Sequence, residues 1–284
     1  MNGFLNLYKP KGVSSAYLLN AVKRSIRGEV VGHMGTLDPL ASGVLPVAIG
    51  KSTRLFDYLL DKKKVYVARF TFGYQTDTLD LEGKVEKTCD FIPDIERVKA
   101  ESQKLVGEIM QIPPVYSAKC VNGKRSYELA RKGEKVELPP KKVTINSIEV
   151  INQLSKEEFE VRIECRGGTY IRSIARDLGE LCSSCATMTA LERVESGVFT
   201  VENSVSAEDF IKSNDKASFL MPPQDVVDYP IITLNEKQTE RLFNGLYDIY
   251  DLADGIYKVF CPDGFYGVGD VKDGKIKVKA YVRT

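Results

Sequence analysis

The stretch from Gly32 to Pro46 constrains the fold of this chain more than any other segment. It reads Gly-His-Met-Gly-Thr-Leu-Asp-Pro-Leu-Ala-Ser-Gly-Val-Leu-Pro, and its three glycines and two prolines exclude a regular helix. Asp38 precedes Pro39, which favours an extended backbone at this carboxylate. His33 is the only histidine in the chain. Any histidine-based acid–base mechanism would therefore have to use this tightly turning stretch.

Length and composition place the chain among ordinary globular proteins. Its 284 residues are 43% apolar and 28% charged, which suits one large domain or a large domain with a small one. The N-terminus lacks the basic and apolar regions of a signal peptide. No apolar run approaches the ~18 residues that a membrane span needs. We therefore expect a cytoplasmic protein with no membrane partner.

Hydrophobic periodicity predicts both helices and strands. One helix begins at Ser14-Ser15 and ends at Gly28, a second runs from Asp94 through Ile109 to Pro113-Pro114, and a third opens at Gly167-Gly168 and buries a stripe from Ile171 to Leu181. Alternating residues predict strands at 65–72, 143–150 and 159–165, and Lys84–Lys87 follows the turn at 77–83 as a return strand. The pattern indicates an α+β protein.

The C-terminal part has a different character. Residues 222–230 carry three prolines and form the best linker candidate. Beyond them, short β-like runs at 256–260, 265–268 and 275–282 are separated by glycine turns. These runs predict a small β-rich domain.

The cysteines suggest no metal or redox chemistry. The six residues, at positions 89, 120, 165, 182, 185 and 261, are too scattered for a disulfide scaffold in a chain of this length. Cys182-Ser-Ser-Cys185 is a single C-x-x-C without a second pair. We expect these two thiols on or near the end of a helix and predict no metal site.

Charge is nearly balanced overall but uneven along the chain. The net charge is +1, whereas the segment from Lys119 to Lys142 holds eight basic and three acidic residues. Further clusters occur at Lys62-Lys63-Lys64 and between Lys272 and Arg283. Each cluster alone is equally compatible with ordinary solvated surface, but three together favour phosphate-backbone contact. The segment at 115–142 resembles a protruding insertion with a short helix-like stretch ending at Gly133.

Two apparent phosphate or metal motifs fail on inspection. Gly50-Lys51-Ser52 resembles the end of a phosphate-binding loop, but position 45 is leucine where that loop needs glycine. The acidic turn from Asp77 to Glu82 lacks the order of a calcium loop, and a surface hairpin is the favoured interpretation.

Four residues have both a structural and a functional interpretation. Asp38 could simply close an Asx-type turn, and His33 could be a satisfied structural residue. By periodicity Tyr66 is a core tyrosine, and Arg172, near the start of a helix, would normally be solvated. The residues taken one by one do not decide between these readings.

Several motifs together resemble the TruB family of tRNA pseudouridine synthases. Besides Gly32–Pro46 they are Lys9-Pro-Lys-Gly-Val-Ser-Ser15, Lys64-Val-Tyr66, Gly73-Tyr-Gln-Thr-Asp-Thr78, Gln111-Ile-Pro-Pro-Val-Tyr-Ser-Ala-Lys119, Tyr127-Glu-Leu-Ala-Arg-Lys-Gly133 and Gly167-Gly-Thr-Tyr-Ile-Arg172. They occur in the family's order across about the first 200 residues. Most are weak singly, but the set is highly specific.

The resemblance implies a role for each matching position. Asp38 matches the family's nucleophile, Tyr66 the tyrosine that stacks on the target base, and Arg172 the arginine that pairs with the aspartate. Tyr170 and Leu191 match further contacts to the flipped nucleotide, and His33 matches the histidine that enters the RNA loop. Two positions depart from the pattern: Met34 replaces a frequent threonine, and Glu192 replaces a basic residue that often follows the leucine. We expect Arg172 to ionise Asp38 and to orient it bidentately.

The resemblance also implies a fold and an activity. We expect a pseudouridine-synthase-type catalytic domain with an antiparallel sheet over residues 1–228, including a basic insertion at about 113–142, and a PUA-like RNA-binding domain over 229–284. The expected reaction converts uridine-55 in the T-loop of tRNA to pseudouridine by base flipping and covalent catalysis. Attack of Asp38 on the base and on the sugar both remain open.

Partners and alternatives follow from the same resemblance. The expected partner is the tRNA T-stem-loop, bound by a monomer without cofactor or guide RNA. One alternative is the guide-RNA-dependent relative, which the compact chain disfavours. Another is an RNA-binding chaperone that folds tRNA, although a pure binder needs no nucleophile.

Overall fold

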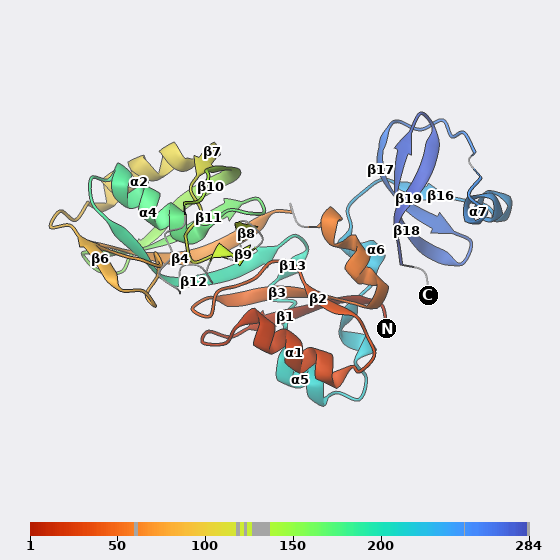
Figure 1. Ribbon diagram of the computed structural model, residues 1–284, viewed down its shortest axis with the longest axis horizontal. Helices are drawn as coiled ribbons and strands as arrows, with labels where there is room; N and C mark the ends of the chain where they lie inside the picture. The colour runs from red at the N-terminus through yellow and green to blue at the C-terminus, as the bar shows by residue number, and fades with distance from the viewer. Residues whose placement is uncertain (60–61, 118–119, 122–123, 127–136, 247, 283–284) are drawn as a thin grey trace.

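Two β-sheets of unequal size, each with helices beside it, lie along the long axis of the molecule (Figure 1). The computed structural model describes residues 1–284 except 60–61, 118–119, 122–123, 127–136, 247 and 283–284. The N-terminus lies beside the small sheet, close to the C-terminal end of the described chain (Figure 1). Among the described residues, no helix is long and apolar enough to cross a membrane.

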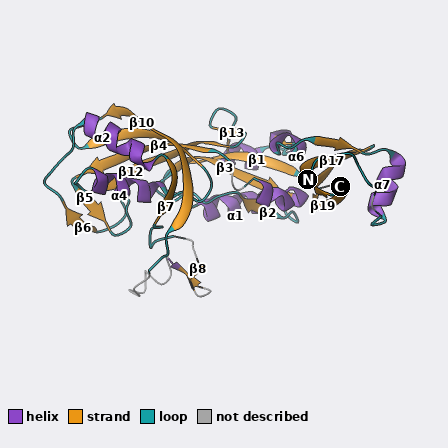
Figure 2. Cartoon of the chain, turned by 90° about the horizontal axis from the view of Figure 1, so that it is seen from above, coloured by secondary structure: helices purple, strands orange, loops and turns teal. Residues whose placement is uncertain are grey.

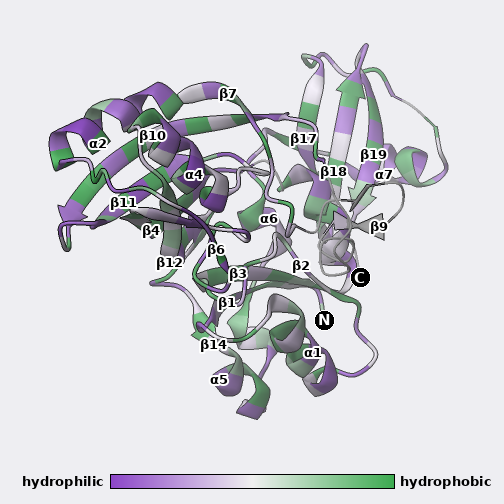
Figure 3. Ribbon diagram, turned by 60° about the vertical axis from the view of Figure 1, so that its left-hand side comes forward, coloured by the Kyte–Doolittle hydropathy of each residue, from purple (hydrophilic) through white to green (hydrophobic). Residues whose placement is uncertain are grey.

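The large sheet is mixed and mostly antiparallel. Its main path runs β14-β1-β3-β12-β4-β11-β10-β7, with β2, β13 and β15 paired to its members. The strands are β1 (Gly3–Lys9), β2 (Val31–His33), β3 (Ser42–Ile49), β4 (Lys64–Phe72), β7 (Gly107–Gln111), β10 (Lys141–Gln153), β11 (Glu158–Cys165), β12 (Ala186–Ser196), β13 (Phe199–Thr200), β14 (Val205–Ser206) and β15 (Leu220–Met221). Hydrophobic and hydrophilic residues alternate along several of these strands, as half-buried strands require (Figure 3).

The sheet has two halves that meet at a very short joint. Strands β3 and β12 pair in parallel through only two residue pairs, Glu192↔Ser42 and Arg193↔Gly43. A Cβ at Gly43, whose φ is +103°, would lie 2.3 Å from the carbonyl oxygen of Arg193, so only glycine permits this approach.

Helices cover the two halves separately. Helices α1 (Ser15–Ser25) and α5 (Ala207–Lys212) pack on β1 and β3, where Leu18, Val22 and Phe210 are buried. Helices α2 (Ile95–Ser102) and α4 (Ile171–Leu181) cover the β4–β11–β10 half. The remaining helical segments in the described ranges are the 3₁₀ turns η1 (Gly50–Tyr58), η2 (Gln103–Leu105) and η3 (Ala217–Phe219), and the helices α6 (Pro223–Val226) and α7 (Glu236–Phe243).

The predicted helix from Asp94 to Pro113 is wrong in its second half. Asp94 does cap α2, but the helix ends at Ser102, and residues 107–111 form β7, which pairs antiparallel with β10. Gly107 has a φ of +105°, which ends the helical path, and pairing with the long strand β10 outweighs local helical periodicity.

The return strand after the acidic turn also has a different partner. Strand β6 (Val85–Thr88) pairs with β5 (Tyr74–Thr76), a short strand that follows β4. Strand β4 itself pairs with β11 and β12. The β5–β6 hairpin is therefore a separate two-stranded unit that carries the turn at 77–83.

The expected insertion projects from the sheet where it is described. Its strands β8 (Cys120–Val121) and β9 (Lys124–Arg125) form a small hairpin away from the main body (Figure 2). The helix-like stretch ending at Gly133 falls outside the described residues. Lys141 and Lys142 belong to β10, within the sheet.

The small sheet is β-rich, as the C-terminal pattern predicted. It has the order β16-β17-β18-β19, formed by β16 (Ile231–Thr233), β17 (Gly255–Cys261), β18 (Gly264–Lys272) and β19 (Lys275–Tyr281). The proline-rich connection before it is packed, since Val226 and Val227 are buried in one cluster with Val268 and Ala280. The same cluster includes Phe4, so the two sheets share apolar contacts.

One disulfide forms despite the scattered cysteines. Cys89, after β6, bonds Cys185, before β12, with their Cα atoms 5.9 Å apart. Cys182 and Cys185 do lie at the end of a helix, as predicted, since Cys182 directly follows α4, but Cys182 is a free buried thiol. The bond joins the β5–β6 hairpin to the turn that follows α4.

Candidate active site

The loop between β2 and β3 carries Asp38 and is held by helix α1. Ser14 caps that helix by accepting a hydrogen bond from the amide of Tyr17, and the neighbouring Ser15 faces the loop. The hydroxyl of Ser15 accepts from the amide of Leu37 and donates to its carbonyl, both at 2.9 Å. The residue before Asp38 is therefore fixed at both backbone groups.

Lys9 supports the other side of the same loop. Its side chain is fully buried, and its ammonium donates to the carbonyls of Val13 at 2.7 Å and Pro39 at 3.5 Å. Burial lowers the Lys9 pKa to about 8, while the nearby Asp38 carboxylate acts in the opposite direction. The sequence analysis quoted Lys9 within a motif but assigned it no role.

Arg172 lies between two carboxylates at the start of α4. Its Nε is 3.0 Å from Oδ2 of Asp38, and its Nη1 is 3.3 Å from Oδ2 of Asp80. The guanidinium also donates to the carbonyls of Thr78 at 3.1 Å and Tyr116 at 3.0 Å. The guanidinium of Arg172 thus contacts two carboxylates, whereas we expected a bidentate contact with Asp38 alone. The solvated position that periodicity favours for Arg172 is wrong, because the residue is buried.

The environment of Asp38 combines burial with opposing charges. Burial raises the pKa of its carboxyl, Arg172 acts to lower it, and Asp80 raises it further. The side chain is still 35% exposed, so a substrate atom can reach it. The site therefore holds a reachable carboxylate whose ionised form depends on Arg172.

Asp80 is the main residue that the sequence analysis missed. It is 4% exposed, and its Oδ1 accepts from the hydroxyl of Thr78 at 2.6 Å and the amide of Glu82 at 3.1 Å. The predicted hairpin does form, but Asp80 does not lie on its surface, because the turn points this carboxylate at Arg172. The leucines at positions 79 and 81 were the available signal, since a solvated turn seldom has apolar residues on both sides of its carboxylate.

Tyr66 lies on β4 within the apolar cluster that contains Leu40 and Leu191. Burial raises the pKa of its phenol, and the neighbouring Arg193 acts to lower it. Arg193 is itself 1% exposed, and it donates to the carbonyls of Val44 at 2.8 Å and Gly35 at 3.1 Å. It therefore connects both ends of the Asp38 loop to the tyrosine, a role that the sequence analysis did not assign.

The two remaining candidates, Tyr170 and His33, lie next to elements that carry the site. Tyr170 immediately precedes α4, where its amide and carbonyl both hydrogen-bond the side chain of Gln111. His33 ends β2, on the far side of Gly35 from Asp38, and its Nδ1 is buried with no hydrogen-bond partner in the described structure. Burial, Arg193 and Lys23 all lower the His33 pKa, so its ring is neutral near pH 7. The structure thus brings Asp38 to Arg172, places Tyr66 and Leu191 in one apolar cluster, and places His33 within the electrostatic reach of Arg193.

In the part of the chain that the structure describes, no group of three or more histidine, cysteine or acidic side chains could hold a metal ion. The chemistry available at this centre is that of a carboxylate, a guanidinium and an aromatic ring.

Solved structures share this fold over almost the whole chain. A chain from the "Crystal Structure of a Cbf5-Nop10-Gar1 Complex" aligns with a TM-score of 0.73 at 22% identity, covering 97% of this chain and 83% of that one. A chain from the "Structure of H/ACA RNP bound to a substrate RNA containing 2'-deoxyuridine" gives a TM-score of 0.74 at 21% identity, covering 99% and 85%. At these identities the likeness concerns the fold.

Sequence relatives are closer. The "tRNA pseudouridine synthase B" of Clostridium kluyveri is 36% identical, covering 99% of this chain and 100% of its own. The protein of the same name from Clostridium perfringens strain 13 is 40% identical over 95% of each chain, and that from Aquifex aeolicus is 36% identical over 98% and 99%.

Residues 23–171, more than half of the chain, match the model described as "TruB family pseudouridylate synthase (N terminal domain)". This range contains the Asp38 loop and ends one residue before Arg172. Fold and match together define a pseudouridylate synthase. The chain belongs to the TruB family of these enzymes.

Proposed function

We propose that this chain isomerises uridine-55 in the T-loop of tRNA to pseudouridine. Its relatives of nearly equal length are named tRNA pseudouridine synthase B, which supports tRNA as the substrate. The observation that carries the catalytic assignment is the contact between Arg172 and Asp38 at 3.0 Å, with Asp38 still reachable from solvent.

The reaction exchanges one bond to the ribose for another. The N1–C1′ glycosidic bond breaks, the uracil rotates, and a C5–C1′ bond forms, while C5 loses a proton and N1 gains one. We assign Asp38 as the covalent nucleophile, in its ionised form, attacking either the base or the sugar. Arg172 favours this ionised form and fixes the direction of the carboxylate, which offsets the cost of burial.

The target base must leave the RNA stack to reach Asp38. We assign Tyr66 as the surface on which this base stacks, with Tyr170 and Leu191 as further contacts to the flipped nucleotide. Leu191 lies in the same apolar cluster as Tyr66, which supports this grouping. His33, neutral and at the edge of the centre, is suited to occupy the space that the base vacates.

We divide the chain into a catalytic domain over residues 1–228 and a PUA-like RNA-binding domain over 229–284. The separate small sheet from β16 to β19 supports this boundary. The basic insertion at 113–142 is assigned to clamp phosphates of a stem-loop recognised by shape. Half of its eight basic residues lie outside the described structure, so this role rests on their charge.

We further propose that the enzyme is a cytoplasmic monomer that needs no guide RNA. The test incubates purified protein alone with an unmodified tRNA transcript and compares wild type with Asp38→Asn. Pseudouridine at position 55 only with wild type supports the proposal, and a transcript with cytidine at that position is the matched control. Product that appears only after a guide RNA is added would reject the stand-alone enzyme. Binding without product in both proteins would leave the tRNA-folding chaperone.

A further inference from the structure

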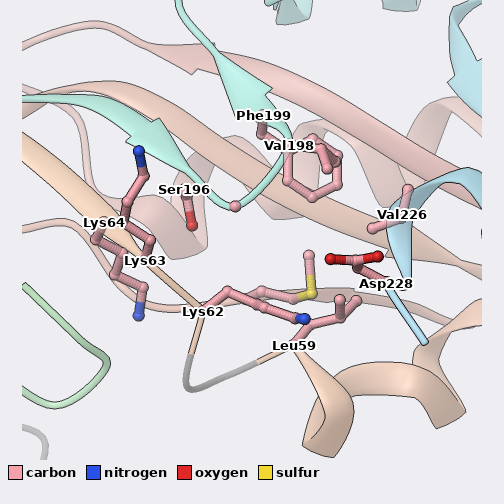
Figure 4. A pocket seen from close by; sticks show the side chains of 11 residues that line it. Leu59, Lys62, Lys63, Lys64, Ser196, Val198, Phe199, Val226 and Asp228 are labelled. Carbon is pink, nitrogen blue, oxygen red and sulfur yellow. The ribbon is translucent and has the colours of Figure 1, made fainter. Parts of the chain in front are cut away.

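A cavity of about 170 Å³ lies beside the catalytic loop and has no part in the mechanism above (Figure 4). Its walls come from distant parts of the chain: Met34 of the loop, Leu59 after η1, Phe199 of β13 and Val226 of α6. The Lys62–Lys64 run, the turn at 196–198 and Asp228 form the rest of the lining. The cavity therefore lies where the catalytic loop, the β12–β13 turn and the connection to the small sheet meet.

The size and the apolar walls suit one flat ring. A buried cavity of ~150 Å³ is enough to hold benzene, so this one accepts a single six-membered ring and is small for two fused rings. Met34 and Phe199 are almost wholly buried and keep these walls apolar. Val198, at the β12–β13 turn, is 40% exposed and also lines the cavity, so it lies at the mouth.

The polar groups at the cavity suit a ligand that has both a negatively charged group and a hydrogen-bond donor on its ring. Lys63 is already paired with Glu195 at 2.8 Å, whereas the Lys62 ammonium lies 5.1 Å from the centre of the Tyr229 ring. Lys62 and Asp228 extend toward each other from opposite sides of the cavity (Figure 4). A phosphate suits the Lys62 ammonium, and an N–H of a pyrimidine suits the Asp228 carboxylate.

The cavity is continuous with the proposed RNA path. Met34 adjoins His33, and Lys64 precedes Tyr66 by two residues on the same strand. The Nζ of Lys64 lies 3.6 Å from where a Cβ of Gly35 would be, next to the catalytic loop. A nucleotide near the flipped base can therefore reach this cavity from the same bound strand.

We propose that this cavity binds a pyrimidine nucleotide of the substrate RNA other than the target uridine. The base enters between Met34 and Phe199, Asp228 accepts from its N–H, and the Lys62 ammonium holds its phosphate. The inference rests on RNA being the substrate, but the binding site can be tested without catalysis.

The first experiment observes Met34 directly. The chain has five methionines, so methyl-labelled methionine gives few NMR signals, and Met34→Leu assigns the relevant one. Titration with cytidine or uridine monophosphate should shift the Met34 signal saturably, with adenosine monophosphate and inorganic phosphate producing much less. Met188, buried in the Tyr66 cluster, reports binding at the catalytic centre separately. An unmoved Met34 signal at saturating nucleotide would overturn the proposal.

A variant at the mouth tests the source of the nucleotide. Val198→Trp places a bulky ring at an exposed turn and should abolish the Met34 shift, while Val85→Trp, exposed on β6, should not. With tRNA transcript, Val198→Trp should raise KM about tenfold with kcat retained. A lost Met34 shift with unchanged KM would reject the RNA nucleotide and assign the cavity to a free one. If wild type showed no turnover but the Met34 signal still shifted, the proposed function would be contradicted while the nucleotide-binding cavity would stand.

Discussion

Asp80 and Asp38 share one guanidinium: Nη1 of Arg172 contacts Asp80 at 3.3 Å while its Nε contacts Asp38 at 3.0 Å. Asp80 is the more deeply buried of the two and is held by Thr78 and by a backbone amide. It is therefore suited to hold Arg172 in place rather than to touch the substrate. Asp80 thus orients Arg172, and the oriented arginine in turn contacts Asp38.

Asp80→Asn keeps the size of the side chain but removes the charge that orients Arg172. We expect kcat to fall on the order of 100-fold, because small displacements of a catalytic group cost that much, with KM little changed. Steady-state kinetics on a tRNA transcript measure this. Asp90→Asn, at an exposed position after β6, is the matched control and should behave as wild type. A rise in KM alone would place Asp80 in substrate binding.

Arg172→Lys keeps a positive charge but cannot reach both carboxylates with a planar fork. We expect turnover to fall about 100- to 1,000-fold, as for the loss of a preorganised charge-stabilising donor, with the protein still folded. Arg176→Lys, one turn further along α4, controls for the substitution itself. Near-normal turnover with Arg172→Lys would remove the arginine from the mechanism.

The raised pKa of Asp38 makes a prediction about stability. The folded protein retains a proton on Asp38 at pH values where the unfolded chain has already lost it, so its contribution to stability falls as pH rises through this window. Asp38→Asn has no such proton. Its free energy of unfolding relative to wild type should therefore increase from acidic to neutral pH and then level off. Urea denaturation of both proteins at several pH values tests this, and a difference that declines with pH would contradict it.

Comparing Tyr66→Phe with Tyr66→Ala separates the contribution of ring stacking to tRNA binding from that of the phenol hydroxyl. Stacking of a base on an aromatic ring contributes about 1–3 kcal/mol, so the alanine variant should lose roughly 5- to 150-fold in tRNA affinity while phenylalanine keeps most of it. Binding is measured in an Asp38→Asn background to prevent turnover. The alanine variant should also lose about 3–5 kcal/mol of stability from the cavity it leaves, so binding is compared where both variants are folded. Equal affinities would argue against stacking.

Reduction of the Cys89–Cys185 bond should lower the melting temperature. The bond closes a loop across a sequence separation of 96, for which the chain-entropy model gives up to about 4–5 kcal/mol. Cys89→Ser should melt where reduced wild type does, and added reductant should not change it further. Identical melting of oxidised and reduced wild type would show that the bond contributes nothing to stability.

Local patterns predicted much of the fold because they depend on burial along a single element. The strands at 65–72, 143–150 and 159–165 all lie within observed strands, and the helix at 171–181 matches α4. Strand β7 was mispredicted as helix because its identity depends on pairing with β10, some 30 residues later. A strand at a sheet edge leaves too weak a local pattern to be recognised.

The residues of the candidate site also fall into those that local motifs indicate and those that depend on tertiary contacts. Asp38, Tyr66 and Arg172 could be nominated from motifs, since each lies in a recognisable segment. Asp80 and Arg193 lie in no recognised catalytic motif, because their importance comes from contacts across the fold: Arg193 reaches Gly35 and Asp80 reaches Arg172. Charge buried by tertiary packing leaves little trace in a short window of sequence.

The joint between β3 and β12 connects the catalytic loop to the junction of the two halves of the sheet. Only two residue pairs join the halves of the sheet there, and the Asp38 loop runs directly into one of them at Gly43. Arg193 forms one of these pairs through its backbone, while its guanidinium donates to the carbonyls of Val44 and Gly35. One side chain thus anchors the catalytic loop to the strand that joins the halves, so a change at Arg193 would disturb the position of Asp38 and the junction of the sheet together.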